Sequence, residues 1–317
     1  MFYLVKNLIM FIIFIFAFIA GTSYASHFRY GTISWQPVSN TTTTVTMLIT
    51  HSWGWRNDFS AATACDSTTI ANRTLMGVVN SILCDVGCTV ANQVVGDTSM
   101  YCTAYSGPLL DNWSMGQKSY PIIIPVSSDV EIYFTSSSWV TLVVGGGTWM
   151  VRAKINTLVR SDIGQINSSP ITTSAPSYCI RQGYIYQIIL PMADANQGDD
   201  LRCRWSLATP TDECGGICGS INTISNLTYS KSSAGYQCLL TFNAALISTT
   251  DSGLNYILNN FYIHALIIIK FKLNIAYVAA ALMIEDFATS TSTTPLSGVP
   301  LQFLIKITYS ASTCTIP

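Results

Sequence analysis

Charged side chains are scarce in this sequence of 317 residues. Lys, Arg, Asp and Glu make up only 10% of it, and 15 basic residues nearly balance 16 acidic ones. A nucleic-acid-binding protein needs a basic patch or stripe, and a disordered acidic tail needs an excess of one sign. The composition therefore excludes both classes, and we expect no nucleic-acid partner.

Catalytic motifs are scarce as well. The chain has three histidines and neither a Gly-x-Ser-x-Gly elbow nor a phosphate loop, and glycines 145–147 are not followed by Lys-Ser/Thr. Glu285 and Asp286 are adjacent, so on a strand they point to opposite faces. His27 and His51 are expected to be structural or surface histidines. A pair acting as a base or as metal ligands is the alternative, which is disfavoured because no matched nucleophile accompanies them. We expect no enzymatic activity.

What the chain does have begins with a targeting segment. Lys6 precedes an uncharged apolar run from Leu8 to Ala20, and the small residues Ser23 and Ala25 flank Tyr24 in the manner that signal peptidase accepts. We expect residues 1–25 to be a signal peptide and the protein to be secreted or on the cell surface, with no membrane span after cleavage. An uncleaved anchor is the alternative, although the run is short for a spanning helix.

Ten cysteines, all beyond residue 25, fit an oxidised extracellular framework. Their three-residue spacing in Cys84–Cys88 and Cys214–Cys218 also suits zinc, but no histidine lies nearby, so disulfides are favoured. Cys203 and Cys238 face inward on expected strands and would join two sheets, while the other pairings stay open. The disulfide cysteines are Cys65, Cys84, Cys88, Cys102, Cys179, Cys203, Cys214, Cys218, Cys238 and Cys314.

Five Asn-x-Ser/Thr acceptors agree with that location. Each lies beside Ser, Thr or Gly-rich sequence, which places several of them on exposed turns, although some are expected to be unused or buried. The predicted glycosylation sites are Asn40, Asn72, Asn112, Asn167 and Asn226.

Period-two alternation indicates strands along most of the chain. Within 148–159, the side chains of Trp149, Val151, Ala153 and Ile155 are expected inward and those of Arg152, Lys154 and Asn156 outward. Short strands without amphipathic helices predict an all-β fold of two tandem antiparallel β-sandwich domains, immunoglobulin- or cadherin-like and disulfide-bonded. The expected strands are 28–35, 43–53, 121–126, 130–135, 139–144, 148–159, 184–190, 201–206, 237–242, 277–284 and 299–308.

The first domain is expected at 26–159, with a loop-rich cysteine insertion at 57–118. Residues 160–177 contain Asp, Gly, Asn and two prolines with little hydrophobic pattern, which indicates a linker before a second domain at 178–317. Residues 255–276 are almost entirely Ile, Leu, Phe, Tyr, Asn and Lys, and we interpret them as a retained intron. A membrane helix is a rival interpretation, although polar and charged residues interrupt the apolar run too often for one. A long apolar hairpin is another.

Several segments resemble an animal extracellular family without an established activity. They are Ser26–Trp35 (SHFRYGTISW), Asp199–Trp205, Glu213–Cys218, Ala281–Phe287 and Pro295–Phe303. Proteins of that family begin with a Ser-His-Phe-Arg-Gly-Gly-like strand, and Tyr30 stands here where glycine is usual. The region often precedes EGF-like repeats, in proteins some of which are labelled integrin-β-like. Such repeats are expected to be absent or truncated in this chain.

One constellation suggests a metal. Asp194, Asn196, Asp199 and Asp200 place oxygen side chains around Gly198, which can wrap a hard cation such as Ca²⁺. The twelfth position of an EF-hand loop holds Trp205 in place of Glu, so a site between strands is the candidate, with Asp162, Asn167, Glu285 or Asp286 adding ligands as cadherin-type linkers do. A solvated polar turn is the alternative, and no other cofactor is expected.

The sequence thus predicts a secreted or cell-surface binding or adhesion module for an extracellular protein or carbohydrate. Trp53 and Trp55 share a strand face and offer either a sugar platform or core packing. A self-associating component of extracellular matrix or surface coat is the alternative function, and a secreted hydrolase is a third.

Overall fold

The computed structural model describes residues 27–107, 111–127, 129–233, 235–247 and 275–308. The expected signal peptide, nearly all of the suspected insert, and Cys314 lie outside these ranges. Within them the chain is almost entirely β, with a 13-stranded sheet and a 4-stranded sheet. No helix in the described part of the chain is long and apolar enough to cross a bilayer.

The elements of the first half are β1 (Phe28–Asn40), β2 (Thr44–Trp55), the short helix α2 (Ser67–Ala71), β3 (Leu75–Met76), β4 (Ser81–Val86), β5 (Gln93–Asp97), β6 (Met100–Ser106), β7 (Trp113–Pro125), β8 (Val130–Ser137) and β9 (Thr148–Ile155). Those of the second half are β10 (Ile171–Thr172), β11 (Ser177–Arg181), β12 (Ile185–Ala193), β13 (Asp200–Trp205), η1 (Gly215–Ile217), β14 (Ser225–Ser232), β15 (Gly235–Asn243), η2 (Ala244–Leu246), β16 (Ile275–Phe287) and β17 (Ser297–Thr308).

An aromatic core fills the first half. Strands β6, β7, β2 and β1 pair in that order, as do β9, β8, β4 and β5. Their inward side chains include Trp53, Trp55, Trp149 and Phe134, each at most 1% exposed. The ring of Phe28 stacks on Trp149 at 4.3 Å between centroids. The inward positions expected on β9 are therefore confirmed, and Trp53 and Trp55 are core residues, so the sugar-platform interpretation is wrong.

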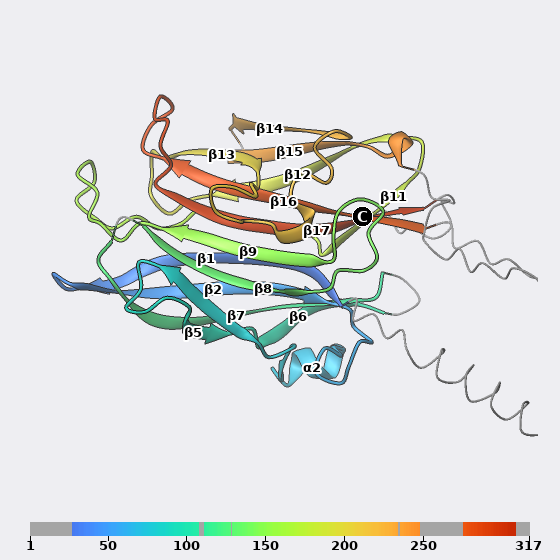
Figure 1. Ribbon diagram of the computed structural model, residues 1–317, viewed down its shortest axis with the longest axis horizontal. Coiled ribbons are helices and arrows are strands. Elements are labelled where there is room, and N and C mark those ends of the chain that lie inside the picture. The colour runs from blue at the N-terminus through green and yellow to red at the C-terminus, as the bar shows by residue number, and fades with distance from the viewer. Residues whose placement is uncertain (1–26, 108–110, 128, 234, 248–274, 309–317) are drawn as a thin grey trace, which may run out of the picture.

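Strands β16 and β17 lie between that core and the four-stranded sheet, as the layers of Figure 1 show. One face of β17 carries Leu301, Phe303, Ile305 and Ile307 into the core of the second half. On its other face, Leu304 joins the core of the first half. Strands buried on both faces read as nearly continuous apolar runs, which explains the sequence of β16 and β17.

The halves share hydrogen-bonded strands. On one edge β17 pairs with β16, and on the other with β11, β1 and β9 in turn. The linker expected at 160–177 is packed in part, because Ser169 N donates to the carbonyl of Trp35 at 2.9 Å. The division into two domains stays a prediction, although the pairing between β1 and β17 crosses it.

Three local expectations differ from the structure. Residues 139–144 form a loop in which Trp139 makes an isolated bridge to Phe28. The loop does not form a strand because its backbone bonds elsewhere: Val143 N donates to the Tyr277 carbonyl of β16 at 2.9 Å. The stretch 57–118 contains α2, β3 to β6 and the start of β7. Arg152, expected outward, is buried, because the segment before η1 covers the outer face of β9.

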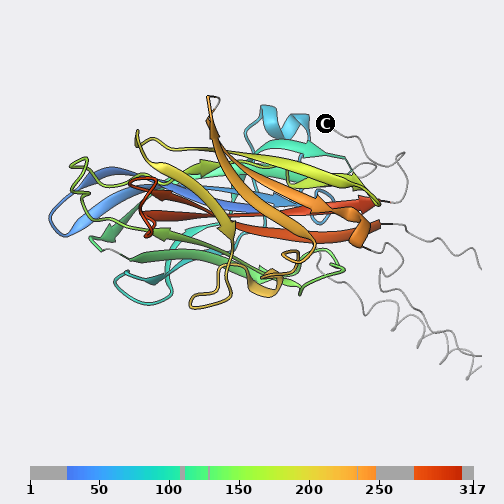
Figure 2. The same ribbon diagram turned by 90° about the horizontal axis from the view of Figure 1, so that it is seen from above.

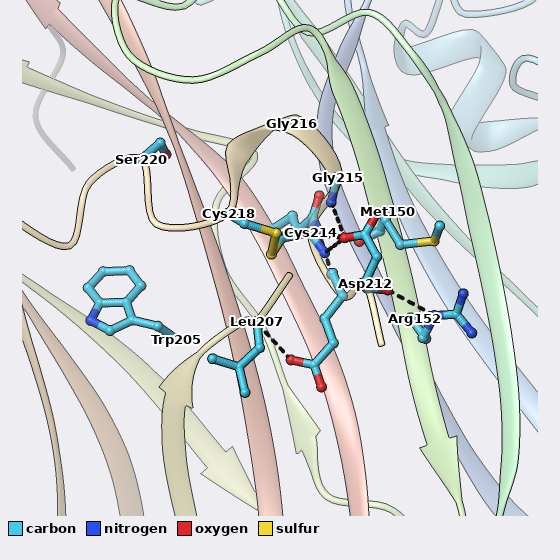
Figure 3. Close-up of a disulfide and its surroundings, with 12 residues drawn as sticks. Met150, Arg152, Trp205, Leu207, Asp212, Cys214, Gly215, Gly216, Cys218 and Ser220 are labelled. Carbon is cyan, nitrogen blue, oxygen red and sulfur yellow. Dashed lines mark hydrogen bonds between the residues drawn. A yellow bond between two sulfur atoms is a disulfide. The ribbon is translucent and has the colours of Figure 1, made fainter. Parts of the chain in front are cut away.

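That covering segment also carries Glu213, which contacts both halves. Figure 3 shows its neighbours Asp212 and Cys214 beside Met150 and Arg152 of β9. Glu213 is 1% exposed and accepts hydrogen bonds from Arg204 at 2.7 and 3.0 Å and from the Leu207 amide at 2.9 Å. Lys154 of β9 pairs with it at 2.9 Å. Burial raises the pKa of Glu213, but the hydrogen bonds from Arg204 and Lys154 outweigh it and lower the pKa overall. The Glu213 carboxylate, which belongs to the second half, is thus neutralised partly by Lys154 of the first half.

Disulfides reinforce both halves. Cys65–Cys102 and Cys84–Cys88 tie the region 57–118. Cys203–Cys238 joins β13 to β15, and therefore one sheet to the other, while Cys214–Cys218 closes the turn around η1. Cys179 is disulfide-bonded too.

We predict that Glu213→Gln lowers the free energy of unfolding by about 2 kcal/mol, because Arg204 and Lys154 lose their hydrogen bonds to a buried charged group. Urea unfolding of the purified protein measures the loss. The matched control is Asp58→Asn, which breaks a surface pair with Arg56 and should cost less than about 1 kcal/mol. Equal, small losses for the two variants would show that Glu213 does not hold the halves together.

Candidate binding site at the loop end

Loops from both halves gather at one end of the molecule, on the left in Figure 1. They are the β1–β2 hairpin tip, the segment after β9, and the turn between β12 and β13. Two shallow hollows of about 460 and 390 Å³ lie there. Asn40, Val159 and Ile166 line both hollows, and Asn196 borders the smaller one. Loops at the end of a β-scaffold are common binding surfaces.

A buried polar network supports these loops. Arg160, 7% exposed, holds Asp199 through two hydrogen bonds of 2.5 and 2.7 Å. The same guanidinium donates to Asn167 Oδ1 at 2.6 Å, and Asn167 Nδ2 donates to Asp286 Oδ2, also at 2.6 Å. The Ser297 hydroxyl donates a hydrogen bond to the other oxygen of Asp286. The hydrogen bonds that Arg160 donates to Asp199 raise the pKa of Arg160, so the guanidinium stays charged.

Asp194 completes the cluster. One carboxylate oxygen each from Asp194, Asp199 and Asp286 lies within 4.8 Å of the other two. Asp194 Oδ1 accepts from the Asn196 amide at 2.7 Å, while Oδ2 is buried and has no hydrogen-bond partner among the residues that the structure describes. Burial raises the pKa of Asp194 to about 7, with Asp286 and Asp199 adding to the shift. Burial also raises the pKa of Asp286 to about 6.

The expected calcium ligands separate in the structure. Asp194 and Asp199 converge, and Asp286 joins them. Asp200 instead pairs with Arg202 at 2.8 Å, and Asn196 Oδ1 accepts from the Ser168 amide at 2.8 Å. Both oxygens of Asp199 and of Asp286 already accept hydrogen bonds. Arg160 supplies positive charge to the cluster. An added cation would bind at Asp194 Oδ2, because the other carboxylate oxygens of the cluster already accept hydrogen bonds.

The remaining candidates take other places. His27 stacks on Phe59 at 4.2 Å between ring centroids. His51 is fully buried beside Trp53, and burial lowers its pKa to about 4, so it stays neutral. Glu285 pairs with Arg204 at 2.8 Å, away from the partners of its neighbour Asp286. Sequence reasoning did not assign a role to Arg160, whose only signal was its position in a polar stretch.

The five glycosylation acceptors also differ in their surroundings. The side chains of Asn40, Asn72 and Asn226 are exposed. Asn112 is half-buried and donates to Asp58 at 2.8 Å. Asn167 is 1% exposed, and its amide nitrogen, the atom that would carry the sugar, donates to Asp286.

We predict that Asp194→Asn changes the pH dependence of stability. Because the folded pKa of Asp194 is raised above the unfolded value of 3.8, the folded state holds an extra proton between about pH 4 and pH 7. The free energy of unfolding therefore falls as pH rises through that window, and the variant should show a smaller fall. Urea unfolding at pH 5 and pH 7.5 measures the difference.

The control for that measurement is Asp129→Asn, which removes an exposed carboxylate and should keep the wild-type slope. A wild-type slope in Asp194→Asn as well would mean that Asp194 is ionised in the folded protein at pH 5.

Comparison with known proteins concerns the first half. Residues 29–157 match the family described as integrin beta-like protein A-E, N-terminal. The matched range begins in β1, ends just after β9 and covers less than half of the chain. The chain matches no curated protein. Its first half is therefore similar to the N-terminal region of an integrin beta-like family.

Proposed function

We propose that this protein is an extracellular binding or adhesion module without catalytic activity, and that the loop end is its binding surface. The observation that carries the proposal is the pair of hollows there, both lined by the β1–β2 hairpin and the segment after β9, with Asn196 of the second half bordering the smaller one. The disulfides fit an oxidising location, and the integrin beta-like description of the matched family supports an adhesive role. The signal peptide, secretion and the finer resemblance to proteins with EGF-like repeats belong to the same proposal.

The construction of the loop end favours binding. Arg160, Asn167, Asp199 and Asp286 fix the loops from beneath, so little conformational entropy is lost when a partner binds. Above them, Val38 and Val159 expose apolar surface among Asn, Ser and Thr side chains. Such a mixed surface suits an extracellular protein or a carbohydrate.

We predict that the double variant Val38→Glu/Val159→Glu weakens binding to a partner found by screening the secreted protein against extracellular proteins and a glycan array. Two charges placed among apolar contacts should weaken affinity at least about tenfold. The control is Leu75→Glu, which changes a similarly exposed apolar residue on β3. A partner that binds the double variant as well as the wild type would place the binding surface elsewhere.

The alternative function, self-association in extracellular matrix or a surface coat, is an outcome of the same work. A protein that binds nothing in the screens but assembles as its concentration rises, followed by sedimentation velocity, would favour that alternative over the binding module.

Calcium at the Asp194 side of the acidic cluster is a further part of the proposal. Calorimetric titration of calcium into the secreted protein should show binding between micromolar and millimolar concentrations and a raised melting temperature, as for extracellular calcium sites. Asp194→Asn should lose both effects, while Asp129→Asn retains them. Absence of heat in the wild type would mean that the cluster binds no calcium. Arg160 would then be the cation that the carboxylates share, and the turn from Asp194 to Asp200 would be a polar loop.

A further inference from the structure

The outer face of the four-stranded sheet carries exposed isoleucines next to polar residues such as Gln187 and Thr241. The sheet pairs β10, β12, β15 and β14 in that order and forms the top layer in Figure 1; Figure 2 looks down on it. Its inner face buries Leu190, Leu240 and Phe242. On its outer face Ile185 is 66% exposed and Ile189 is 58% exposed. Exposed apolar side chains that share one face of a sheet can contribute to association with other molecules.

A glycosylation acceptor lies on the same face. On β14, Leu227 stands opposite the buried Leu240 and packs inward. Because side chains alternate along a strand, Asn226 and Thr228 on either side of it point outward, and both are exposed. Asn226-Leu227-Thr228 is an Asn-x-Thr acceptor. Both polar residues that define the acceptor therefore lie on the outer face of the sheet.

The strand register places the acceptor close to the isoleucines. Thr228 stands opposite Leu239 of β15, which stands opposite Ile189 of β12. Since neighbouring strands are about 4.8 Å apart and residues rise about 3.4 Å along a strand, Ile189 lies roughly 10 Å across and 7 Å along from Asn226. A branched oligosaccharide attached at Asn226 reaches that distance.

We propose that Asn226 carries an N-linked glycan that lies over Leu239 and Ile189 and keeps this sheet face from associating with other molecules. In the transfer, Asn226 Nδ2 bonds to the anomeric carbon of a lipid-diphosphate-linked oligosaccharide. The bond from that carbon to the phosphate oxygen breaks, the lipid diphosphate leaves with the electron pair, and one amide proton is lost. The inference rests on the proposed extracellular location.

Among the other acceptors, none combines these features. Asn167 is buried and hydrogen-bonded to Asp286. Asn112 donates to Asp58. Asn40 ends β1 at the hairpin tip, and Asn72 follows α2, so each is exposed but lies away from this sheet. The occupant of the apolar face is therefore assigned to the acceptor that shares it.

The experiment expresses the full chain in eukaryotic cells and maps glycans on the secreted protein by mass spectrometry after enzymatic release in H₂¹⁸O. Thr228→Ala removes the acceptor, and Thr228→Ser, the matched control, keeps it. Thr42→Ala removes the Asn40 acceptor at the hairpin tip. Sedimentation velocity then measures the self-association of each secreted protein.

We expect Asn226 to be glycosylated and Asn167 to be bare. Thr228→Ala should strengthen self-association about tenfold, while Thr228→Ser and Thr42→Ala match the wild type. Adding Ile189→Ser to Thr228→Ala should restore wild-type behaviour, which would identify the isoleucine face as the surface that associates.

The outcomes separate this inference from the proposed function. Glycans at Asn40 or Asn72 with Asn226 bare would overturn the inference alone. A glycan at Asn226 whose loss leaves self-association unchanged would overturn the shielding role. No secretion and no glycan on the chain would overturn the extracellular proposal and this inference with it.

Discussion

Strand β17 is the element on which the rest of the structure depends, because both of its edges and both of its faces are satisfied by other strands. All twelve of its residues are buried. Its apolar face fills the second core, while Gln302 and Lys306 on the other face face the first half. Gln302 donates to the Met150 carbonyl at 2.6 Å, and Lys306 donates to Asp111 at 3.0 Å. Burying those polar groups is favourable only with such partners. Strand β17 can therefore take its buried position only when the first half is folded.

The same rule governs the loop end. Asp194, Asp199 and Asp286 bring three carboxylates together where water is largely excluded, and Arg160 brings one guanidinium. Burial raises the pKa of both Asp194 and Asp286, and the neighbouring carboxylates add to each shift. A protein can relieve such an imbalance by protonation or by binding a cation, and at this site either route acts on loops that also line the proposed binding surface.

Much of the fold was predictable from the sequence, because alternation is a local signal. Strands such as β2, β9 and β12 follow it directly. Pairing between the halves was not predictable, since Tyr30 and Phe303 meet across almost the whole chain. At the site, the turn from Asp194 to Asp200 was visible, but Arg160 and Asp286 come from distant segments. The stretch 160–177 resembled a linker because its polar residues look solvated in sequence, whereas Asn167 and Arg160 use theirs in the interior.

Asn40 connects glycosylation to binding. It borders both hollows at the loop end and begins an exposed acceptor. A glycan there stands at the rim of the binding surface, whereas one at Asn226 lies on a sheet face that no loop shares. Because sugar attached to Asn40 would occupy volume beside Val38, it would limit the proposed surface to partners that approach from the Val159 side or that contact the sugar itself. Glycans at Asn40 and Asn226 would therefore have opposite consequences: the first would narrow recognition at the loop end, and the second would prevent association at the sheet.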